Sequence, residues 1–338
     1  YRDEAMLVIN DVHLAATRVA GTTPTSAAAL KKFTLDSFES FMSGANEPVL
    51  IAGDLFDVWQ AGLSDVLRTY QILKAWLTKG HKLVVMAANH DLSTDSSKFG
   101  SLQFLMALLS DEPNVQFVIH AGAWVAEGMY CVPHVANSDL FDMELAKVPE
   151  CEVLFLHANL DNPWACSSDH SLNVTREQLD KLPAKLVYFG HEHHARRLGK
   201  AFVGGVQWPT SVSDCLDKKD KFAYRITGTA IEPIKTWDSA TNYAEIDWRN
   251  PESSDAQFIR FVGHCKPDEA AEMANVIAAY RRSSDAFVIT NAVKVGEDTE
   301  GAELELASLE AINKFNVMDA LKEYLSVEDV KILESLNA

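Results

Sequence analysis

Five short apolar segments of the chain each run directly into polar residues. They are residues 6–9, 49–52, 83–86, 153–156 and 186–189. Apolar runs of this length predict strands that are buried on both faces of a sheet. Stretches with apolar residues at helical spacing lie between the strands, at 30–42, 65–79 and 102–109. The alternation predicts an α/β layered fold from the N-terminus to about residue 226.

The polar residues at the strand ends are carboxylates, amides and imidazoles. They are Asp11, His13, Asp54, Asn89, His157, His191 and His193. Ligand sites gather at strand ends in sheets of this kind, and imidazole with carboxylate suits Mn, Fe or Zn. Seven donors exceed the four or so that one metal uses, so the sequence favours two ions bridged by a carboxylate, for which we select Asp54. Such a pair activates water for in-line attack on phosphorus, which predicts phosphate ester hydrolysis.

Composition limits the class of protein. The 338 residues are 47% hydrophobic, which suits a globular chain with a large core and a second unit. No apolar run approaches the roughly 18 residues of a membrane span, and the N-terminus lacks a signal-peptide pattern. The five cysteines are scattered without metal-site spacing, so we expect a cytoplasmic protein that does not bind membranes.

The negative charge is concentrated at the C-terminal end. The chain carries a net charge of −18, of which residues 241–338 contribute −10, from 19 acidic and 9 basic residues. Residues 1–240 therefore carry −8, and bound metal would neutralise some of those acids. The first part of the chain is less repulsive to DNA than the total charge indicates.

The pattern changes after residue 226. Glycine, proline and serine in 227–257 indicate loops and a boundary, after which 258–262, 267–280 and 287–290 predict a strand, a helix and a strand. An acidic linker at 296–301 precedes short amphipathic helices in 304–336. Those helices either bind a partner or pack back on their own domain. The predicted domains are 1–230, 231–296 and 297–338.

Five motifs carry a family resemblance. Asp11-x-His13, Gly53-Asp54-x-x-Asp57, Asn89-His90-Asp91, the isolated His157 and Gly190-His191-x-His193 occur in the order found in calcineurin-like metallophosphoesterases. One motif alone would be weak, but five in order are specific. The resemblance implies a layered β-sandwich core flanked by helices, here followed by a small α/β cap and a C-terminal helical tail.

Within that superfamily the chain most resembles the SbcD or Mre-eleven type nuclease subunit, including its short bacteriophage versions. The resemblance implies a manganese-dependent exonuclease and endonuclease that acts on DNA in replication, recombination and repair, with Mg, Fe or Zn as other metals. It also implies a homodimer bound to a coiled-coil ATPase of the SbcC or Rad-fifty type. A phage protein of this type would act in the host cytoplasm.

The resemblance also assigns roles to the motif residues. One metal would be bound by Asp11, His13, Asp54 and His193. The other would be bound by Asp54, Asn89, His157 and His191. His90 would face the scissile phosphate, stabilising the transition state or protonating the leaving oxygen, and Asp57 would orient His90 by a hydrogen bond.

Two departures from the family pattern stand out. Ala88 replaces the glycine that commonly precedes Asn-His, and 204–210 lacks the usual Gly-Ser-Pro-like turn. Arg196 and Arg197 follow the last motif closely enough to contact a phosphate backbone or to lie in a solvated turn. Lys218, Lys219 and Lys221 form a second basic cluster, for which a solvated turn is slightly favoured.

Two other functions compete with the nuclease. The first is a small-molecule phosphoesterase or pyrophosphohydrolase of the same fold, but lipid-precursor hydrolases of this kind tend to have Arg in place of His90 and lack a cap and tail. The second is a scaffold without turnover. Scaffolds typically lose ligands, whereas this sequence retains all seven.

Overall fold

The computed structural model describes residues 5–16, 24–93, 95, 98–162, 171–284, 286 and 288–296. The chain separates into two compact units, residues 1–263 with 271–294, and residues 264–270 with 295–338. The predicted helical tail in 304–336 lies outside the described residues.

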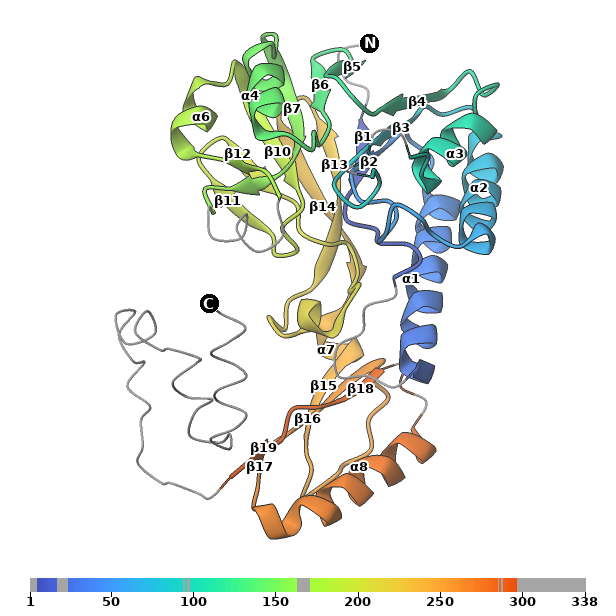
Figure 1. Ribbon diagram of the computed structural model, residues 1–338, viewed down its shortest axis with the longest axis vertical. Coiled ribbons are helices and arrows are strands. Elements are labelled where there is room, and N and C mark those ends of the chain that lie inside the picture. The colour runs from blue at the N-terminus through green and yellow to red at the C-terminus, as the bar shows by residue number, and fades with distance from the viewer. Residues whose placement is uncertain are drawn as a thin grey trace, which may run out of the picture. The chain divides into compact units, whose positions relative to one another are not determined.

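Two six-stranded sheets form the centre of the first unit (Figure 1). The first has the order β14-β13-β1-β2-β3-β4, made by Ala230–Trp237, Lys221–Thr227, Met6–Ile9, Val49–Ala52, Leu83–Met86 and Val115–Val118. The second has the order β11-β12-β10-β7-β6-β5, made by Arg196–Leu198, Ala201–Val203, Ala184–Gly190, Cys151–His157, Met129–Val132 and Ala123–Ala126. All five strands predicted from the apolar runs are confirmed, as β1, β2, β3, β7 and β10.

Alternate residues of each strand face opposite sides of its sheet, which explains why the apolar runs are continuous. In β1, Met6 and Val8 belong to the core between the two sheets, whereas Leu7 and Ile9 belong to the core under the helices of the first sheet. Strands β7 and β10 divide their residues in the same way between the central core and the second helical side. The layered β-sandwich is therefore confirmed.

Helices cover the outer face of each sheet (Figure 1). Helices α1 (Pro24–Gly44), α2 (Leu63–Leu77) and α3 (Ser101–Leu108) pack on the first sheet through the core that contains Phe38, Leu73 and Leu102. Helices α4 (Ser138–Ala146) and α6 (Arg176–Lys181) pack on the second sheet through Phe141 and Leu179. The three helices predicted from periodicity are confirmed as α1, α2 and α3, with a longer α1.

The predicted boundary at 230/231 falls inside strand β14. Strand β14 pairs with β13 from Thr227↔Ala230 to Lys221↔Trp237, so the first sheet continues to Trp237. Half of its eight residues are exposed, among them Pro233, which an edge strand tolerates because one side of its backbone is not paired. An exposed strand with proline lacks the apolar run that marked the buried strands.

A small parallel sheet follows the sandwich. It has the order β15-β16-β18, made by Tyr243–Asp247, Phe258–Val262 and Val288–Asn291, and helix α8 (Ala270–Ser283) joins the last two strands. The predicted strand, helix and strand are therefore confirmed. The rings of Phe33 in α1 and Phe258 in β16 lie 5.4 Å apart, so this sheet packs against the phosphoesterase part of the same unit.

The remaining elements are short. They are β8 (Asn159–Leu160), β9 (Asn173–Val174), η1 (Val212–Cys215), α7 (Ser239–Asn242), β17 (His264–Cys265), η2 (Pro267–Glu269) and β19 (Lys294–Val295). Within the described residues, no helix has the length and apolar character needed to cross a bilayer.

Candidate metal centre

The ends of strands from both sheets meet at one cavity of about 260 Å³. Its lining comprises His13, Ala16, Asp54, Asp57, His90, His191, His193, Thr210 and Ser211. Asp54 follows β2, His90 follows β3, and His191 and His193 follow β10, so residues far apart in the sequence converge here. The cavity therefore gathers the strand-end residues that the sequence pattern selected.

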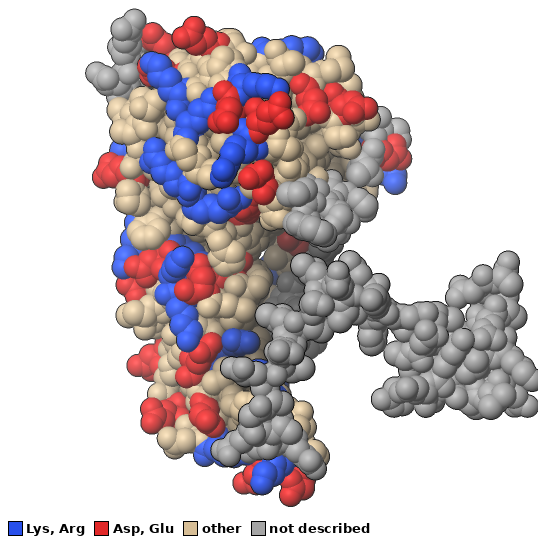
Figure 2. All heavy atoms as spheres, turned by 90° about the vertical axis from the view of Figure 1, so that its left-hand side faces the viewer, with Lys and Arg blue, Asp and Glu red and all other residues tan. Residues whose placement is uncertain are grey.

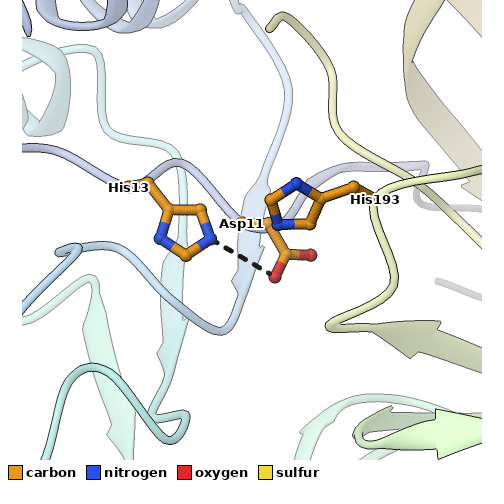
Figure 3. Close-up of side chains that lie close together, drawn as sticks. All are labelled: Asp11, His13 and His193. Atoms are coloured by element: carbon orange, nitrogen blue, oxygen red, sulfur yellow. Dashed lines mark ion pairs between the residues drawn. The ribbon is translucent and has the colours of Figure 1, made fainter. Parts of the chain in front are cut away.

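Three groups of side chains place their donor atoms within 4.8 Å of one another. The first consists of Asp11, His13 and His193, the second of Asp54, His157 and His191, and the third of His13, Asp57 and His90. Figure 3 shows the three side chains of the first group close together, with a dashed line from the His13 ring to the Asp11 carboxylate. The first group contains every predicted ligand of one ion except Asp54. The second group contains every predicted ligand of the other ion except Asn89.

Asp54 connects the two groups. Its Oδ2 lies 3.2 Å from Nε2 of His157 and 3.9 Å from Nε2 of His13. Asp11 Oδ1 lies 3.8 Å from Nε2 of His157 and 3.9 Å from Nε2 of His13. Distances near 3.9 Å are too long for hydrogen bonds, but they suit two ligands of one ion whose metal bonds are each about 2.0–2.2 Å long.

The backbone at these residues is strained. Asp11, His13, Asp54 and His191 all have positive φ, at 50°, 49°, 49° and 90°. A left-handed backbone costs a residue with a Cβ roughly 1–3 kcal/mol and persists where the surroundings impose it. Such strain clusters at functional sites, and here it turns side chains from different loops toward one point.

Each of three imidazoles is oriented through Nδ1. His13 Nδ1 lies 3.1 Å from Asp57 Oδ1, and His193 Nδ1 lies 2.8 Å from Asp214 Oδ1. His157 Nδ1 donates to the carbonyl oxygen of Ala52 at 3.2 Å. A metal-binding histidine characteristically uses its second nitrogen in this way, which fixes the ring and leaves Nε2 as the ligand atom.

The buried polar atoms fit a metal. Asp11 Oδ1, His13 Nε2 and Asn89 Oδ1 are buried and have no hydrogen-bond partner within the described residues. The other Asp11 oxygen, Oδ2, accepts from the backbone N–H of His191 at 2.9 Å. An unsatisfied buried polar atom costs about 1–3 kcal/mol, so several of them at one place indicate a missing ligand. These residues therefore fit divalent metal.

Interactions between neighbouring charges favour the ionised form of the Asp54 carboxylate and the protonated forms of His157 and His193 while metal is absent. Burial alone would raise the pKa of Asp54, but His157 and the other imidazoles hold it well below its usual range. Burial would lower the pKa of His157, yet Asp54 and Asp11 raise it to about 9. Burial likewise opposes the effect of Asp214, which raises the pKa of His193 to about 9. Metal binding must displace these protons, so we expect metal affinity to fall as pH decreases below about 9.

The contact between Asp57 and His90 is made by backbone. His90 Nδ1 lies 2.6 Å from the carbonyl oxygen of Asp57, whereas the Asp57 carboxylate pairs with His13. The Asp57 carboxylate therefore orients His13, a predicted metal ligand, and the hydrogen bond to His90 involves the Asp57 backbone. A carbonyl oxygen only accepts, so Nδ1 of His90 carries the proton and Nε2 is the nitrogen available for proton transfer.

The loop of the third motif is held by Asp91. Its carboxylate accepts from the backbone N–H of Phe56 at 3.0 Å and of Ala88 at 3.1 Å, while the N–H of His90 donates to Asp54 at 3.0 Å. Burial raises the pKa of Asp91 to about 7. Ala88 does not have positive φ, so alanine is compatible with the backbone at this departure from the family pattern.

Gly53 is required for space as well as conformation. It has φ of 100°, and an added Cβ would lie 2.2 Å from His157 Nδ1 and 2.8 Å from Ala88 Cβ. Gly80 has φ of 83°, with nothing within 4 Å of its added Cβ. Both alanine variants carry the strain of a positive φ. The difference between their free energies of unfolding therefore measures the steric overlap at Gly53. We expect Gly53→Ala to lose about 1–3 kcal/mol more unfolding free energy than Gly80→Ala in urea titrations. Equal losses would contradict this.

Asp214 is a functional residue that sequence reasoning missed. Its Oδ2 accepts from Thr210 N, Thr210 Oγ1 and Ser211 N at 2.8–2.9 Å, and its Oδ1 meets His193. The only local signal is the Ser211-x-x-Asp214 spacing of a capping box, which indicates a helix start and not a metal site. The contact with His193 exists only in the folded chain.

Asp214→Asn should weaken Mn²⁺ binding by roughly 10–100-fold, as loss of a partner that orients a ligand usually does. In this variant, the side-chain amide oxygen can accept the hydrogen bonds from Thr210 and Ser211 only if the NH₂ group faces the Nδ1–H of His193. Two donors would then face each other. Calorimetric titration with Mn²⁺ measures the effect. Asp217→Asn is the matched control, because Asp217 pairs with the exposed His194 and with Lys221. Unchanged affinity in Asp214→Asn would show that this pair does not position the ligand.

The remaining sequence departures have structural roles. Gln207 Oε1 accepts from Asn10 N at 3.0 Å and the Gly205 carbonyl accepts from Asn10 Nδ2 at 2.8 Å, so residues 204–210 hold the strand end that carries Asp11.

Two other residues near the site have structural contacts or surroundings. Arg196 forms an ion pair with Glu192 at 2.8 Å. His134 is buried, and its burial lowers its pKa to about 4, in agreement with a structural role.

A β-sandwich between helical layers, with carboxylates and imidazoles at its joined strand ends, is the arrangement of a metal-dependent hydrolase. Residues 5–195 match the family model described as calcineurin-like phosphoesterase, which is more than half of the chain. The protein belongs to the calcineurin-like phosphoesterase family, whose members are hydrolases of phosphoester bonds that typically bind divalent metals.

Comparisons with individual proteins add little to the family. No curated protein matches the sequence. One solved crystal structure is 10% identical, with a TM-score of 0.38, over 69% of this chain and 99% of that chain. A cold-active protein-tyrosine phosphatase of a psychrophilic Shewanella is 12% identical, with a TM-score of 0.33, over 69% of this chain and 78% of that chain.

Proposed function

We propose that this protein is a metal-dependent DNA nuclease of the SbcD or Mre-eleven type. The observation that carries the proposal is the position of His90, which lines the same cavity as Asp54, His191 and His193. An imidazole there can protonate a poor leaving group such as a sugar oxygen of DNA. Lipid-precursor hydrolases of the superfamily, the main alternative, tend to have Arg at this position.

The residues divide the chemistry among them. Asp11, His13, Asp54 and His193 would hold one divalent ion, with Asp54, Asn89, His157 and His191 for the second. When bound, Mn²⁺ or a similar ion supplies an activated water and neutralises charge on the phosphate. Asp57 and Asp214 hold imidazole ligands in place, and His90 donates the proton to the leaving oxygen.

In this proposal the chain acts in the cytoplasm with a coiled-coil ATPase that binds residues 297–338. The order of parts supports it, because a small α/β sheet follows the phosphoesterase core and precedes that segment. Removal of residues 304–338 should abolish ATPase binding and spare hydrolysis of a simple phosphodiester. ATPase binding by the shortened chain would contradict the assignment.

A homodimer is part of the same proposal. Helix α2 carries leucines that are not all part of the hydrophobic core. Leu73 and Leu77 are buried, whereas Leu67 is 53% exposed and Leu63 is 76% exposed. An exposed apolar stripe of this kind supports self-association. Leu67→Lys should therefore shift the mass measured by light scattering toward the monomer, and an unchanged mass would argue against this surface.

The test of the activity compares substrates. End-labelled double-stranded DNA, a phosphomonoester and a nucleotide-sugar-like pyrophosphate are incubated with the protein and Mn²⁺, with Asp54→Ala as the inactive control. DNA degradation that disappears in the variant supports the nuclease. Hydrolysis of only the small substrates would overturn the nuclease and favour the small-molecule phosphoesterase.

A further inference from the structure

A second cavity opens between the edges of the two sheets. It has a volume of about 660 Å³ and is lined from β11 and β12 on one side and from β13 and β14 on the other. This size is in the range of small-molecule and cofactor sites. The predicted metal ligands do not line it. Its lining combines two kinds of side chain, aromatic rings and cations.

The aromatic part comprises Phe202, Phe222 and Tyr224. The rings of Phe202 and Tyr224 pack edge to face with centroids 4.9 Å apart, and Tyr224 is buried. Phe222 is half-buried, and no aromatic ring lies against it within the described part of the chain. An aromatic ring in the wall of a cavity can stack on another planar group.

The cationic part comprises Arg197, Lys218 and Lys219. Lys218 is paired with Glu245 at 2.7 Å, and the one carboxylate in the lining, Asp220, is paired with Lys235 at 2.6 Å. Arg197 and Lys219 have no ion-pair partner in the described ranges. Two unpaired cations beside apolar rings are unusual in a chain with a net charge of −18, and they select an anionic ligand.

A small cavity of about 30 Å³ lies between this cavity and the candidate metal centre. It is lined by His193, which also lines the metal centre, and by Ala195, Lys219, Phe222 and Tyr224, which also line the second cavity. Arg197 is four positions after His193 in the sequence, so their Cα atoms lie at most about 14 Å apart. Figure 2 shows Lys and Arg side chains gathered on the face that carries α6, β11 and β12.

We propose that this cavity binds an unpaired nucleotide of a DNA strand whose phosphodiester lies at the metal centre. Phe222 stacks on the base, and Arg197 and Lys219 contact the adjoining phosphates. A nucleotide joins a planar aromatic ring to an anion, which is the combination that the lining selects. The inference rests on the proposed nuclease function and adds to it a preference for ends or regions with unpaired bases.

Binding of a labelled ten-nucleotide oligothymidylate is measured by fluorescence anisotropy, with a chelator present to prevent cleavage. An oligomer with the same phosphates but without bases is compared. The double variant Arg197→Ala, Lys219→Ala should bind oligothymidylate at least about tenfold more weakly, and its salt dependence should fall by about 0.7 in log–log slope per lost charge. Lys32→Ala, an exposed lysine of α1 on the outer side of the first sheet, is the control for charge.

The aromatic contact is tested by Phe222→Leu, which keeps the apolar volume and removes the flat ring. It should weaken oligothymidylate binding roughly fivefold or more and leave binding of the base-free oligomer unchanged. All variants should hydrolyse bis-p-nitrophenyl phosphate with Mn²⁺ at the wild-type rate, which reports an intact metal centre.

Equal affinity of the wild type for both oligomers, or wild-type binding by the double variant, would overturn the nucleotide site. If DNA is cleaved and only these binding results fail, the nuclease stands and this inference falls. If the wild type hydrolyses small phosphoesters but not DNA, the proposed function itself falls.

Discussion

Asp54→Ala should abolish Mn²⁺-dependent hydrolysis and remove bound metal. Asp54 is almost completely buried, and its Oδ2 lies 3.2 Å from His157 Nε2 and 3.9 Å from His13 Nε2. It thus faces both ligand groups, and its loss affects both. Removal of a residue that only orients a ligand costs about 10–100-fold in metal affinity, so loss of a shared ligand should cost at least about 100-fold.

Metal content by mass spectrometry and the rate on a simple phosphodiester measure the two effects of Asp54→Ala. Asp180→Ala, on the exposed side of α6, is the matched control and should retain both metal and rate. A variant that lost activity but kept two tightly bound ions would show that Asp54 is not the bridge.

His90→Ala should keep metal and lose turnover of DNA by roughly 10²–10⁴-fold, the usual contribution of a general acid. The predicted ligand sets do not include His90, and its Nδ1 is engaged with the Asp57 carbonyl at 2.6 Å. The remaining nitrogen, Nε2, can donate a proton to a departing oxygen when the ring is in its cationic form with both nitrogens protonated. The loss should be much smaller for a p-nitrophenyl ester, because that leaving group departs without protonation.

The difference between the two substrates identifies the role of His90. An equal loss on both would indicate stabilisation of charge on the phosphoryl oxygens, and wild-type rates on both would remove His90 from the chemistry. His194→Ala is the matched control, since this neighbouring imidazole is exposed and pairs with Asp217 at 3.1 Å. It should leave metal content and turnover within about twofold of wild type, as expected for a surface pair.

The nuclease and the small-molecule phosphoesterase differ in what they require of the protein surface. A small-molecule phosphoesterase needs only the cavity of about 260 Å³ at the metal centre. A nuclease needs a path for a charged strand. The face with α6, β11 and β12 carries basic side chains (Figure 2), so the nucleotide-binding test also discriminates between the two functions.

The sequence by itself determined the buried strands and the residues at their ends. Apolar runs such as 83–86 and 186–189 are local signals of burial on both faces, and all five became strands. The motif residues from Asp11 to His193 were selected because their types suit metal, and the fold brings most of their donor atoms together. The exposed strand β14 was missed, since an edge strand has no need of an apolar run.

Only the tertiary structure decided how those strand ends meet. The pairing of β1, β2 and β3 in one sheet and of β7 and β10 in another is a long-range property that no local period encodes. The same is true of Asp57, whose carboxylate meets His13, and of Asp214, whose contact with His193 spans 21 residues. Local spacing specifies which face a residue takes within its own element, whereas the partner across a site is specified by packing of the whole core.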